Sequence, residues 1–145
     1  MATENFEILH IEDNEGDQFL TKQAFKSSSL NPNISAAFSG DEGLDFLYKR
    51  NGFENAPTPD IILLDINMPG INGHELLKEV KTSEELRHIP VIMFTSSEAE
   101  SDILKSYNSY ANAYVKKALD FTGFQDCVKA IESFWFTANV FAKAS

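Results

Sequence analysis

The chain has 145 residues, 12 of them basic and 22 acidic, so its formal net charge is −10. The acidic balance argues against nucleic-acid binding, because phosphate contacts need clustered Lys and Arg. A single cysteine excludes an intramolecular disulfide, and no run of about 18 apolar residues indicates a membrane span. With no leader pattern at the start, we expect a cytoplasmic protein with one domain over 1–145, a core over about 6–135 and a helical extension over about 136–145.

Strand and helix patterns alternate along the first half of the chain. An apolar run predicts a strand over residues 6–11, and the polar sequence EDN that follows can cap a helix. That helix is expected over 16–28. Its apolar side is predicted to hold Phe19, Leu20, Ala24 and Phe25. A weaker strand over 33–39 and a helix over 39–48 come next.

The second half repeats this alternation with more apolar strands. Residues 60–66 and 90–96 are apolar on both faces, as central strands of a parallel sheet should be. Helical spacing predicts helices over 74–83 and 97–110. The second of these has few apolar residues, which indicates a mobile or partner-facing element.

The chain is expected to end in a short strand over 111–115 and a helix from about Phe121 to Val140. The inner face of this helix is predicted to contain Phe124, Val128, Ile131 and Trp135. It carries more aromatic residues than one core face can use, and exposed aromatics indicate an interface. We therefore expect a homodimer, with the alternative that the helix only wraps its own domain. The expected interface residues are Phe134, Trp135, Phe136 and Phe141.

Five strands alternating with five helices indicate an α/β domain with a doubly wound parallel sheet and helices on both faces. In such sheets, ligands bind outside the carboxyl ends of the strands. Five polar residues stand at or just after these ends: Glu12, Asp13, Asp65, Thr95 and Lys117. Three carboxylates in one place repel one another unless a cation is bound. Oxygen ligands without His or Cys favour Mg²⁺ or Mn²⁺ over zinc.

A metal ion with a lysine beside a carboxylate suits phosphoryl transfer. The carboxylate attacks while the metal and the ammonium group neutralise charge on the moving phosphoryl oxygens. Each residue also has a purely structural interpretation, since Glu12 and Asp13 can belong to a helix cap and Lys117 can be a solvated surface charge. Their joint occurrence at four strand ends favours a functional site.

Four motifs around these strand ends carry a family resemblance: IEDN, LLDINMPGINGHELL, PVIMFTS and ANAYVKK. From Phe6 to about Trp135 the chain resembles the receiver domain of two-component response regulators. The segment DFLYKRNGFENAPTPDIILLDINMPG and the aromatic end ESFWF are most similar to the stand-alone subgroup that includes phytochrome-associated regulators. The resemblance implies a flavodoxin-like three-layer sandwich with strand order 2-1-3-4-5. It also implies a sensor histidine kinase as partner, with a phytochrome among the candidates.

The resemblance assigns four residues to the phosphoacceptor and its metal. Asp65 is expected to accept the phosphoryl group and to help bind Mg²⁺, the expected cofactor. Asp13 would ligate the metal directly, and Glu12 would act mostly through a bound water. Asn67 would contribute its backbone carbonyl oxygen.

Three further residues receive roles around the phosphoryl group. Thr95 is expected to bond a phosphoryl oxygen, and Lys117 to pair with the group. Tyr114 would be an aromatic switch coupled to Thr95, with a fixed, half-buried side chain as the alternative. One position departs from the family, which usually has a proline with a cis bond after the lysine, whereas Ala118 follows here. A non-proline cis bond costs roughly 2.5–4 kcal/mol, which favours a trans bond unless packing compensates, and the sequence leaves the two isomers open.

The expected function is that of a phosphoacceptor signalling domain that catalyses only its own phosphorylation and dephosphorylation. Its output should run through protein contacts, since no basic recognition helix is present. The main alternative is a receiver-like interaction module that works without phosphorylation. A phosphatase of the haloacid-dehalogenase class would need a second Asp where Asn67 stands. A flavodoxin-like electron carrier would need a hydroxyl- and Gly-rich loop where EDNEGD stands.

Overall fold

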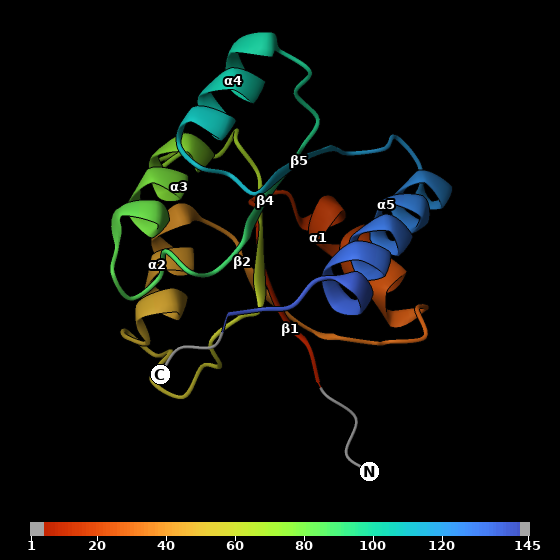
Figure 1. Ribbon diagram of the computed structural model, residues 1–145, viewed down its shortest axis with the longest axis horizontal. Coiled ribbons are helices and arrows are strands. Elements are labelled where there is room, and N and C mark those ends of the chain that lie inside the picture. Colours follow the sequence, from red (N-terminus) through yellow and green to blue (C-terminus); the bar gives the residue numbers. More distant parts are fainter. Residues whose placement is uncertain (1–4, 143–145) are drawn as a thin grey trace.

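Five parallel strands form one sheet in the order β2-β1-β3-β4-β5 in the computed structural model, which describes residues 5–142 (Figure 1). The strands are β1 (Glu7–Ile11), β2 (Asn33–Ala37), β3 (Ile61–Leu64), β4 (Val91–Thr95) and β5 (Ala113–Lys116). The last paired residues of β1 and β3 are Ile11 and Leu64, so the residues that follow them emerge side by side. The predicted fold class and strand order are therefore confirmed.

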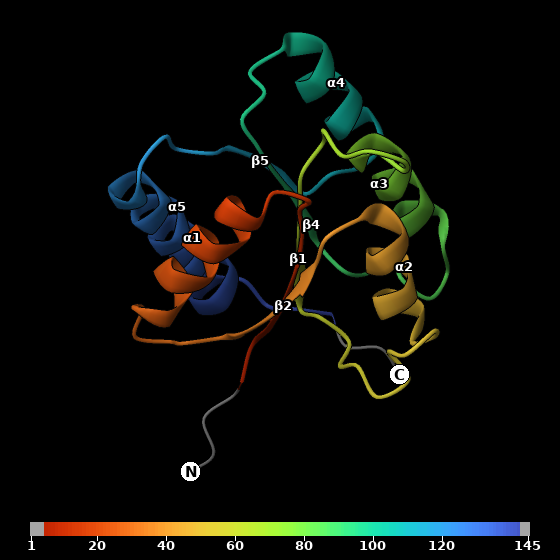
Figure 2. The same cartoon turned by 180° about the vertical axis from the view of Figure 1, so that it is seen from behind.

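Helices cover both faces of this sheet (Figures 1 and 2). They are α1 (Glu15–Lys26), α2 (Gly40–Tyr48), α3 (Gly73–Thr82), α4 (Glu100–Asn108) and α5 (Phe121–Ser133), followed by a π-helical turn, η1 (Phe134–Ala138). α1 and α5 lie on one face, and α2, α3 and α4 lie on the other. Within residues 5–142, none of these helices has the length and apolar character needed to cross a membrane.

Polar side chains define where the helices begin. Asn14 accepts a hydrogen bond from the backbone N–H of Asp17 at 2.8 Å, and Asp120 accepts one from Gly123 at 2.8 Å. Ser39 caps α2 in the same way, and Asn72 forms a reciprocal capping box at the start of α3. Such caps typically stabilise a helix by about 1 kcal/mol. α4 differs, because its N-cap residue makes no side-chain hydrogen bond.

The sheet separates two clusters of buried apolar residues. Successive side chains of β1 point to opposite faces, so Leu9 and Ile11 join the cluster under α2 and α3, whereas Ile8 joins the cluster under α1 and α5. All four residues of β3 are fully buried, which explains its continuous apolar sequence. The core therefore holds β1 and β3 rigidly and fixes the positions of the residues at their carboxyl ends.

The predicted final helix to Val140 is wrong, because α5 ends at Ser133 and the chain leaves η1 at Asn139. The backbone N–H of Asn139 donates to the carbonyl oxygen of Phe134 at 2.8 Å. This hydrogen bond joins residues five positions apart, as in a π-helix, and it widens the last turn. The wider turn directs Phe136 into the core against Phe6, with ring centroids 4.3 Å apart.

This ending changes the aromatic residues expected at an interface. The expected exposure of Phe136 is wrong, since only 8% of it is accessible, whereas Phe134 is 54% exposed. Trp135, predicted on the inner face, is only half-buried and lies stacked against Phe141, with centroids 6.4 Å apart. Trp135 and Phe141 therefore pack together at the edge of the core, whereas Phe136 lies in the core and Phe134 faces solvent.

The buried side of α1 also differs from the predicted one. Phe19 is 61% exposed, and Gln18 takes an inward position instead. The side-chain Nε2 of Gln18 lies 2.9 Å from the carbonyl oxygen of His10, 3.0 Å from that of Glu12 and 3.1 Å from that of Ala37. These contacts satisfy an otherwise costly buried amide and attach α1 to the ends of β1 and β2.

Candidate functional site

Three carboxylates meet at the carboxyl edge of the sheet. Each of Glu12, Asp13 and Asp65 offers one oxygen, and these oxygens lie within 4.8 Å of one another. Glu12 and Asp65 are buried, whereas Asp13 is exposed. Backbone bonds position two of them, because the N–H of Glu12 donates to Ala37 and that of Asp65 donates to Ile11. The predicted acidic cluster therefore exists, with one member open to solvent.

Lys117 extends into this cluster from the end of β5. Its Nζ is hydrogen-bonded to Glu12, lies 2.8 Å from Oδ2 of Asp17, and is 3.7 Å from Oδ1 of Asp65. The backbone N–H of Lys117 donates to the carbonyl oxygen of Thr95 at 2.8 Å, which fixes its approach from β4. Asp17 was not predicted, although its place in the first turn after the EDN motif was the available signal.

Burial and mutual contact shift the pKa values of Glu12 and Lys117. Burial raises the pKa of Glu12 to about 7, although its hydrogen bond with Lys117 acts in the opposite direction. Burial alone would lower the pKa of Lys117, but the hydrogen bonds to Asp17 and Glu12 and the charge of Asp65 leave it above its ordinary value. The lysine is therefore a cation held among carboxylates.

A glycine allows α3 to begin directly against the backbone of Asp65 and Ile66. A Cβ atom on Gly73 would lie 2.2 Å from the carbonyl oxygen of Asp65 and 2.7 Å from Cα of Ile66. The N–H of Gly73 also donates to the carbonyl oxygen of Ile66 at 2.9 Å. Any larger residue here would displace the backbone that carries Asp65.

The fourth strand end supplies a hydroxyl and a loop. Thr95 is fully buried, and its Oγ1 accepts a hydrogen bond from the N–H of Ser97 at 3.3 Å. Tyr114 is half-buried and donates its hydroxyl to the carbonyl oxygen of Ser97 at 3.0 Å. Burial raises the pKa of Tyr114 above its ordinary value. Both residues therefore contact the same loop residue rather than Asp65.

These groups surround an open cleft of about 640 Å³. Its lining includes the three carboxylates, Asn67, Ser96 and Lys117, but not Thr95. No peptide bond within residues 5–142 is cis, so the bond between Lys117 and Ala118, which the sequence left open, is trans. The donors are carboxylate oxygens without His or Cys, a set that suits a hard divalent cation. The cluster is thus a divalent metal-binding site by its chemistry.

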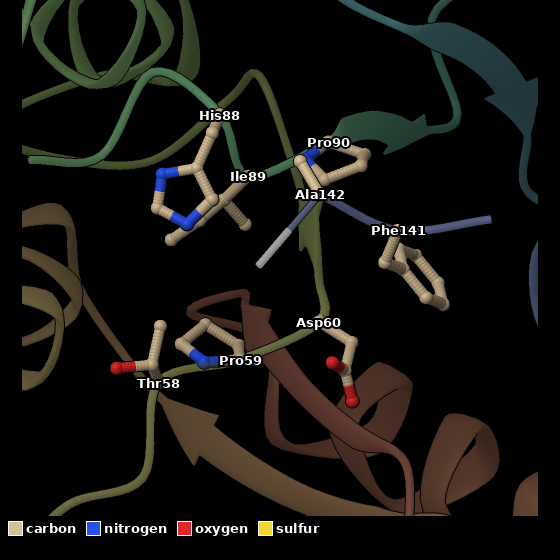
Figure 3. Close-up of a pocket in the computed structure, with 8 residues that line it drawn as sticks. All are labelled: Thr58, Pro59, Asp60, His88, Ile89, Pro90, Phe141 and Ala142. Carbon is tan, nitrogen blue, oxygen red and sulfur yellow. The ribbon is translucent and has the colours of Figure 1, made fainter. Parts of the chain in front are cut away.

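A smaller cavity of about 340 Å³ lies at the opposite, amino edge of the sheet. Figure 3 shows that Asp60, His88 and Phe141 line it, together with residues at the starts of β3 and β4. Oδ2 of Asp60 is already occupied by the backbone N–H of Glu7 at 2.8 Å. None of the predicted metal or phosphoryl-transfer residues contributes to it, so the acidic cleft is the candidate site.

A sheet with this strand order, together with an acidic cluster and a lysine at its carboxyl edge, defines a receiver domain. The chain belongs to the response regulator receiver domain family, which matches it over residues 8–129. This result confirms the predicted family. It identifies the chain as a signalling domain.

Related proteins support the likeness to phytochrome-associated regulators. Response regulator Rcp1 of Synechocystis sp. is 35% identical over 128 residues, which cover 88% of this chain and 87% of Rcp1. The phosphorylated cyanobacterial phytochrome response regulator RcpA has a TM-score of 0.91 at 32% identity, with 97% of this chain and 100% of that chain covered. The Mn(2+)-bound form of Rcp1 has a TM-score of 0.88 at 33% identity, with 95% and 99% covered.

Proposed function

We propose that Asp65 accepts a phosphoryl group from the phosphohistidine of a sensor histidine kinase, with Mg²⁺ bound, and that the domain then signals through protein contacts. The observation that carries this proposal is the position of Asp65. Its carboxylate lies 3.7 Å from the ammonium group of Lys117 and shares a cleft with the carboxylates of Glu12 and Asp13.

The transfer step follows from this geometry. A lone pair of an Asp65 oxygen forms the new O–P bond while the N–P bond of phosphohistidine breaks, and the electron pair of that bond stays on the imidazole nitrogen. Lys117 neutralises charge on the phosphoryl oxygens, because its Nζ already lies beside Asp65. A Mg²⁺ ion held by Asp13, Asp65 and the backbone carbonyl of Asn67, with Glu12 acting through water, would supply further charge neutralisation.

The new group would also change the loop after β4. A phosphoryl group carries about −1.5 to −2 charges at neutral pH and three strong acceptor oxygens. We propose that the hydroxyl of Thr95 turns from Ser97 to one of these oxygens. Tyr114 also bonds to Ser97, so it would follow this movement and act as the switch. The half-buried position of Tyr114 is also compatible with the alternative, in which its side chain stays fixed on phosphorylation.

The partner is proposed from the relatives. RcpA is described as a phytochrome response regulator, and Rcp1 is the relative with 35% identity. We therefore propose a phytochrome with histidine kinase activity as the phosphoryl donor. The acidic cleft supports a donor that approaches from the carboxyl edge of the sheet, because Asp13 and Asn67 are exposed there.

A homodimer is proposed at the β5 edge of the sheet. An apolar groove of about 480 Å³ lies between β5 and α5, and Val115, Ile131, Phe134 and Trp135 are among its lining residues. β5 has a free edge in the described chain, because it pairs only with β4. Sedimentation analysis tests this surface. Phe134→Ser should weaken self-association, whereas Phe19→Ser, beside β2 at the other edge, should not.

Intact mass after incubation with acetyl phosphate tests the phosphoacceptor. We expect the wild type to gain one phosphoryl group only when Mg²⁺ is present, and Asp65→Ala to gain none. Asp126→Ala, which removes an exposed carboxylate from α5, is the control and should be labelled like the wild type. Labelling of Asp65→Ala would overturn the assignment. If neither acetyl phosphate nor a phosphorylated kinase labels the wild type, the phosphorylation-independent interaction module becomes the better account.

A further inference from the structure

A chain of hydrogen bonds connects α3, α4 and the loop between β4 and α4. Nε2 of His74, at the start of α3, lies 3.0 Å from Oδ1 of Asp102 in α4. The hydroxyl of Ser97, in the loop, donates to Oδ2 of the same carboxylate at 2.7 Å. The hydrogen bonds from His74 and Ser97 keep the pKa of Asp102 below its ordinary value. Asp102 of α4 therefore binds α3 through one carboxylate oxygen and the loop through the other.

This chain matters because α4 is otherwise loosely attached. It has one buried side chain, Ser106, whose hydroxyl bonds back to the carbonyl oxygen of Asp102 at 2.7 Å. Two of its large apolar residues face solvent, with Leu104 63% and Tyr107 48% exposed, and Ile103 is only half-buried. α4 stands beside α3 at the end of the helical layer (Figure 1). A helix without a buried apolar face depends on such polar anchors for its position.

Ser97 carries the connection to the candidate site. Its N–H donates to Oγ1 of Thr95 at 3.3 Å, and its carbonyl oxygen accepts the hydroxyl of Tyr114 at 3.0 Å. Its hydroxyl also accepts the N–H of Ala99 at 3.2 Å while donating to Asp102. A movement of Thr95 towards Asp65 therefore disturbs a residue that is hydrogen-bonded through its N–H, carbonyl and hydroxyl groups.

We propose that His74 and Asp102 are positioning residues that act through Ser97 to hold this loop in the unphosphorylated arrangement and so oppose phosphorylation of Asp65. The inference rests on the proposed phosphoacceptor function and adds a built-in restraint to it. A contact made in only one of two conformations stabilises that conformation, and its removal shifts the population towards the other. His74 is fixed for this role, because it is buried at the start of α3 just after Gly73, which packs on Asp65.

The test compares two properties that the proposal moves in opposite directions. Asp102→Ala should lower the free energy of unfolding in urea, because an interaction of the folded state is lost. It should also raise the affinity for beryllium fluoride, an analogue of the aspartyl phosphate, by on the order of fivefold with Mg²⁺ present. A residue with a purely structural role would lower both stability and affinity.

Two further variants sharpen the comparison. Ser97→Ala removes the hydroxyl that links the loop to Asp102, together with its hydrogen bond from the N–H of Ala99, and should raise the affinity with a smaller loss of stability. Glu98→Ala is the matched control, because it removes one negative charge from the same loop and breaks only an exposed ion pair with Lys116, whose atoms are 2.7 Å apart. It should leave the affinity near the wild-type value. An equal increase in Glu98→Ala would show a general charge effect and overturn the proposal.

The outcomes separate this inference from the proposed function. If the wild type binds beryllium fluoride and Asp102→Ala binds it equally or more weakly, the restraint is overturned and the phosphoacceptor function stands. If the wild type shows no binding with Mg²⁺ and no labelling by acetyl phosphate or a kinase, the proposed function fails first and the restraint fails with it. Faster hydrogen exchange of α4 amides in Asp102→Ala, together with tighter binding, supports the proposal.

Discussion

Nζ of Lys117 donates a hydrogen bond to Oδ2 of Asp17 across 2.8 Å, although 100 residues separate the two in sequence. The lysine is thereby held between α1 and the carboxylate of Asp65. Asp17 is partly exposed and Glu12 is buried. Solvent can therefore stabilise the charge of Asp17 without the lysine, whereas the charge of Glu12 needs the lysine. A buried carboxylate that loses its cation is left without compensation.

Lys117→Met should impair both labelling and stability. Loss of one group that stabilises a developing charge typically reduces a rate by about 100-fold or more, and we expect that loss in labelling by acetyl phosphate. At pH 8 the unpaired Glu12 should also lower the free energy of unfolding by about 3–5 kcal/mol. At pH 6 the stability loss should be smaller, because burial raises the pKa of Glu12 and the variant lacks the lysine that lowers it, so the carboxyl group takes up a proton. Mass spectrometry and urea titrations measure these effects, and Lys116→Met, an exposed neighbour, should be nearly neutral.

Gln18→Leu should destabilise the protein although it places an apolar side chain in a buried position. The substitution removes three hydrogen bonds to backbone carbonyl groups at the ends of β1 and β2. We expect the free energy of unfolding to fall by about 2–3 kcal/mol. Urea unfolding measures it, and Lys22→Leu, one helical turn later on α1, is the control. Equal stability of Gln18→Leu and the wild type would contradict the anchoring role of the amide.

His10→Leu should make the protein less sensitive to acid. Burial and the nearby Lys117 charge lower the pKa of His10 from 6.5 to about 3, and within the described chain its two ring nitrogens have no hydrogen-bond partner. The unfolded chain takes up a proton below pH 6.5 and the folded chain does not. Stability attributable to His10 is thus present above pH 6.5 and is lost as the pH falls towards 3.

The expected difference is measurable by urea unfolding at several pH values. Between pH 6 and pH 4, wild-type stability should fall more steeply than that of His10→Leu, by about 1.4 kcal/mol per pH unit. At pH 7 the variant should be at least as stable, since an unpaired buried imidazole is replaced by an apolar side chain. Parallel pH profiles for the two proteins would show that His10 is not responsible for the loss.

Phe136 and Phe134 form a matched pair that tests how the chain ends. Phe136→Ala removes a buried ring that packs on Phe6, and it should lower the free energy of unfolding by about 3–5 kcal/mol. Phe134→Ala removes an exposed ring and should change stability by less than about 1 kcal/mol. Thermal or urea unfolding at low protein concentration distinguishes them. The reverse order would favour the regular helix first predicted over this segment.

The sequence was sufficient for the fold and for the group of carboxylates and lysine at the carboxyl edge of the sheet. The strands before Asp65 and Thr95 are continuous apolar runs with one plausible interpretation, and parallel topology alone brings their carboxyl ends together. Glu12 and Lys117 follow from the same rule. The bond before Ala118 was left open, because packing can compensate the cost of a cis bond without proline, and it is trans.

The rest depended on tertiary contacts that spacing does not encode. Gln18 displaced Phe19 from the buried side of α1 because its partners are carbonyl groups of other elements, which no apolar pattern records. Phe136 reached the core through a π-helical turn, whereas the prediction assumed regular helical spacing. His10 is buried inside β1, and among residues 5–142 its ring nitrogens find no hydrogen-bond partner, which the apolar pattern of the strand does not reveal.

The sparse packing of α4 has an evolutionary consequence. Because this helix contributes no buried apolar side chain to the core, we expect substitutions at Leu104 or Tyr107 to leave the sheet and Asp65 in place. Gene duplication can therefore produce regulators that share one chemistry while their α4 surfaces diverge. Selection for new partners would act on solvent-facing positions of α4, under few constraints from folding. The anchoring pair of His74 and Asp102 would set how far such divergence alters the response to phosphorylation.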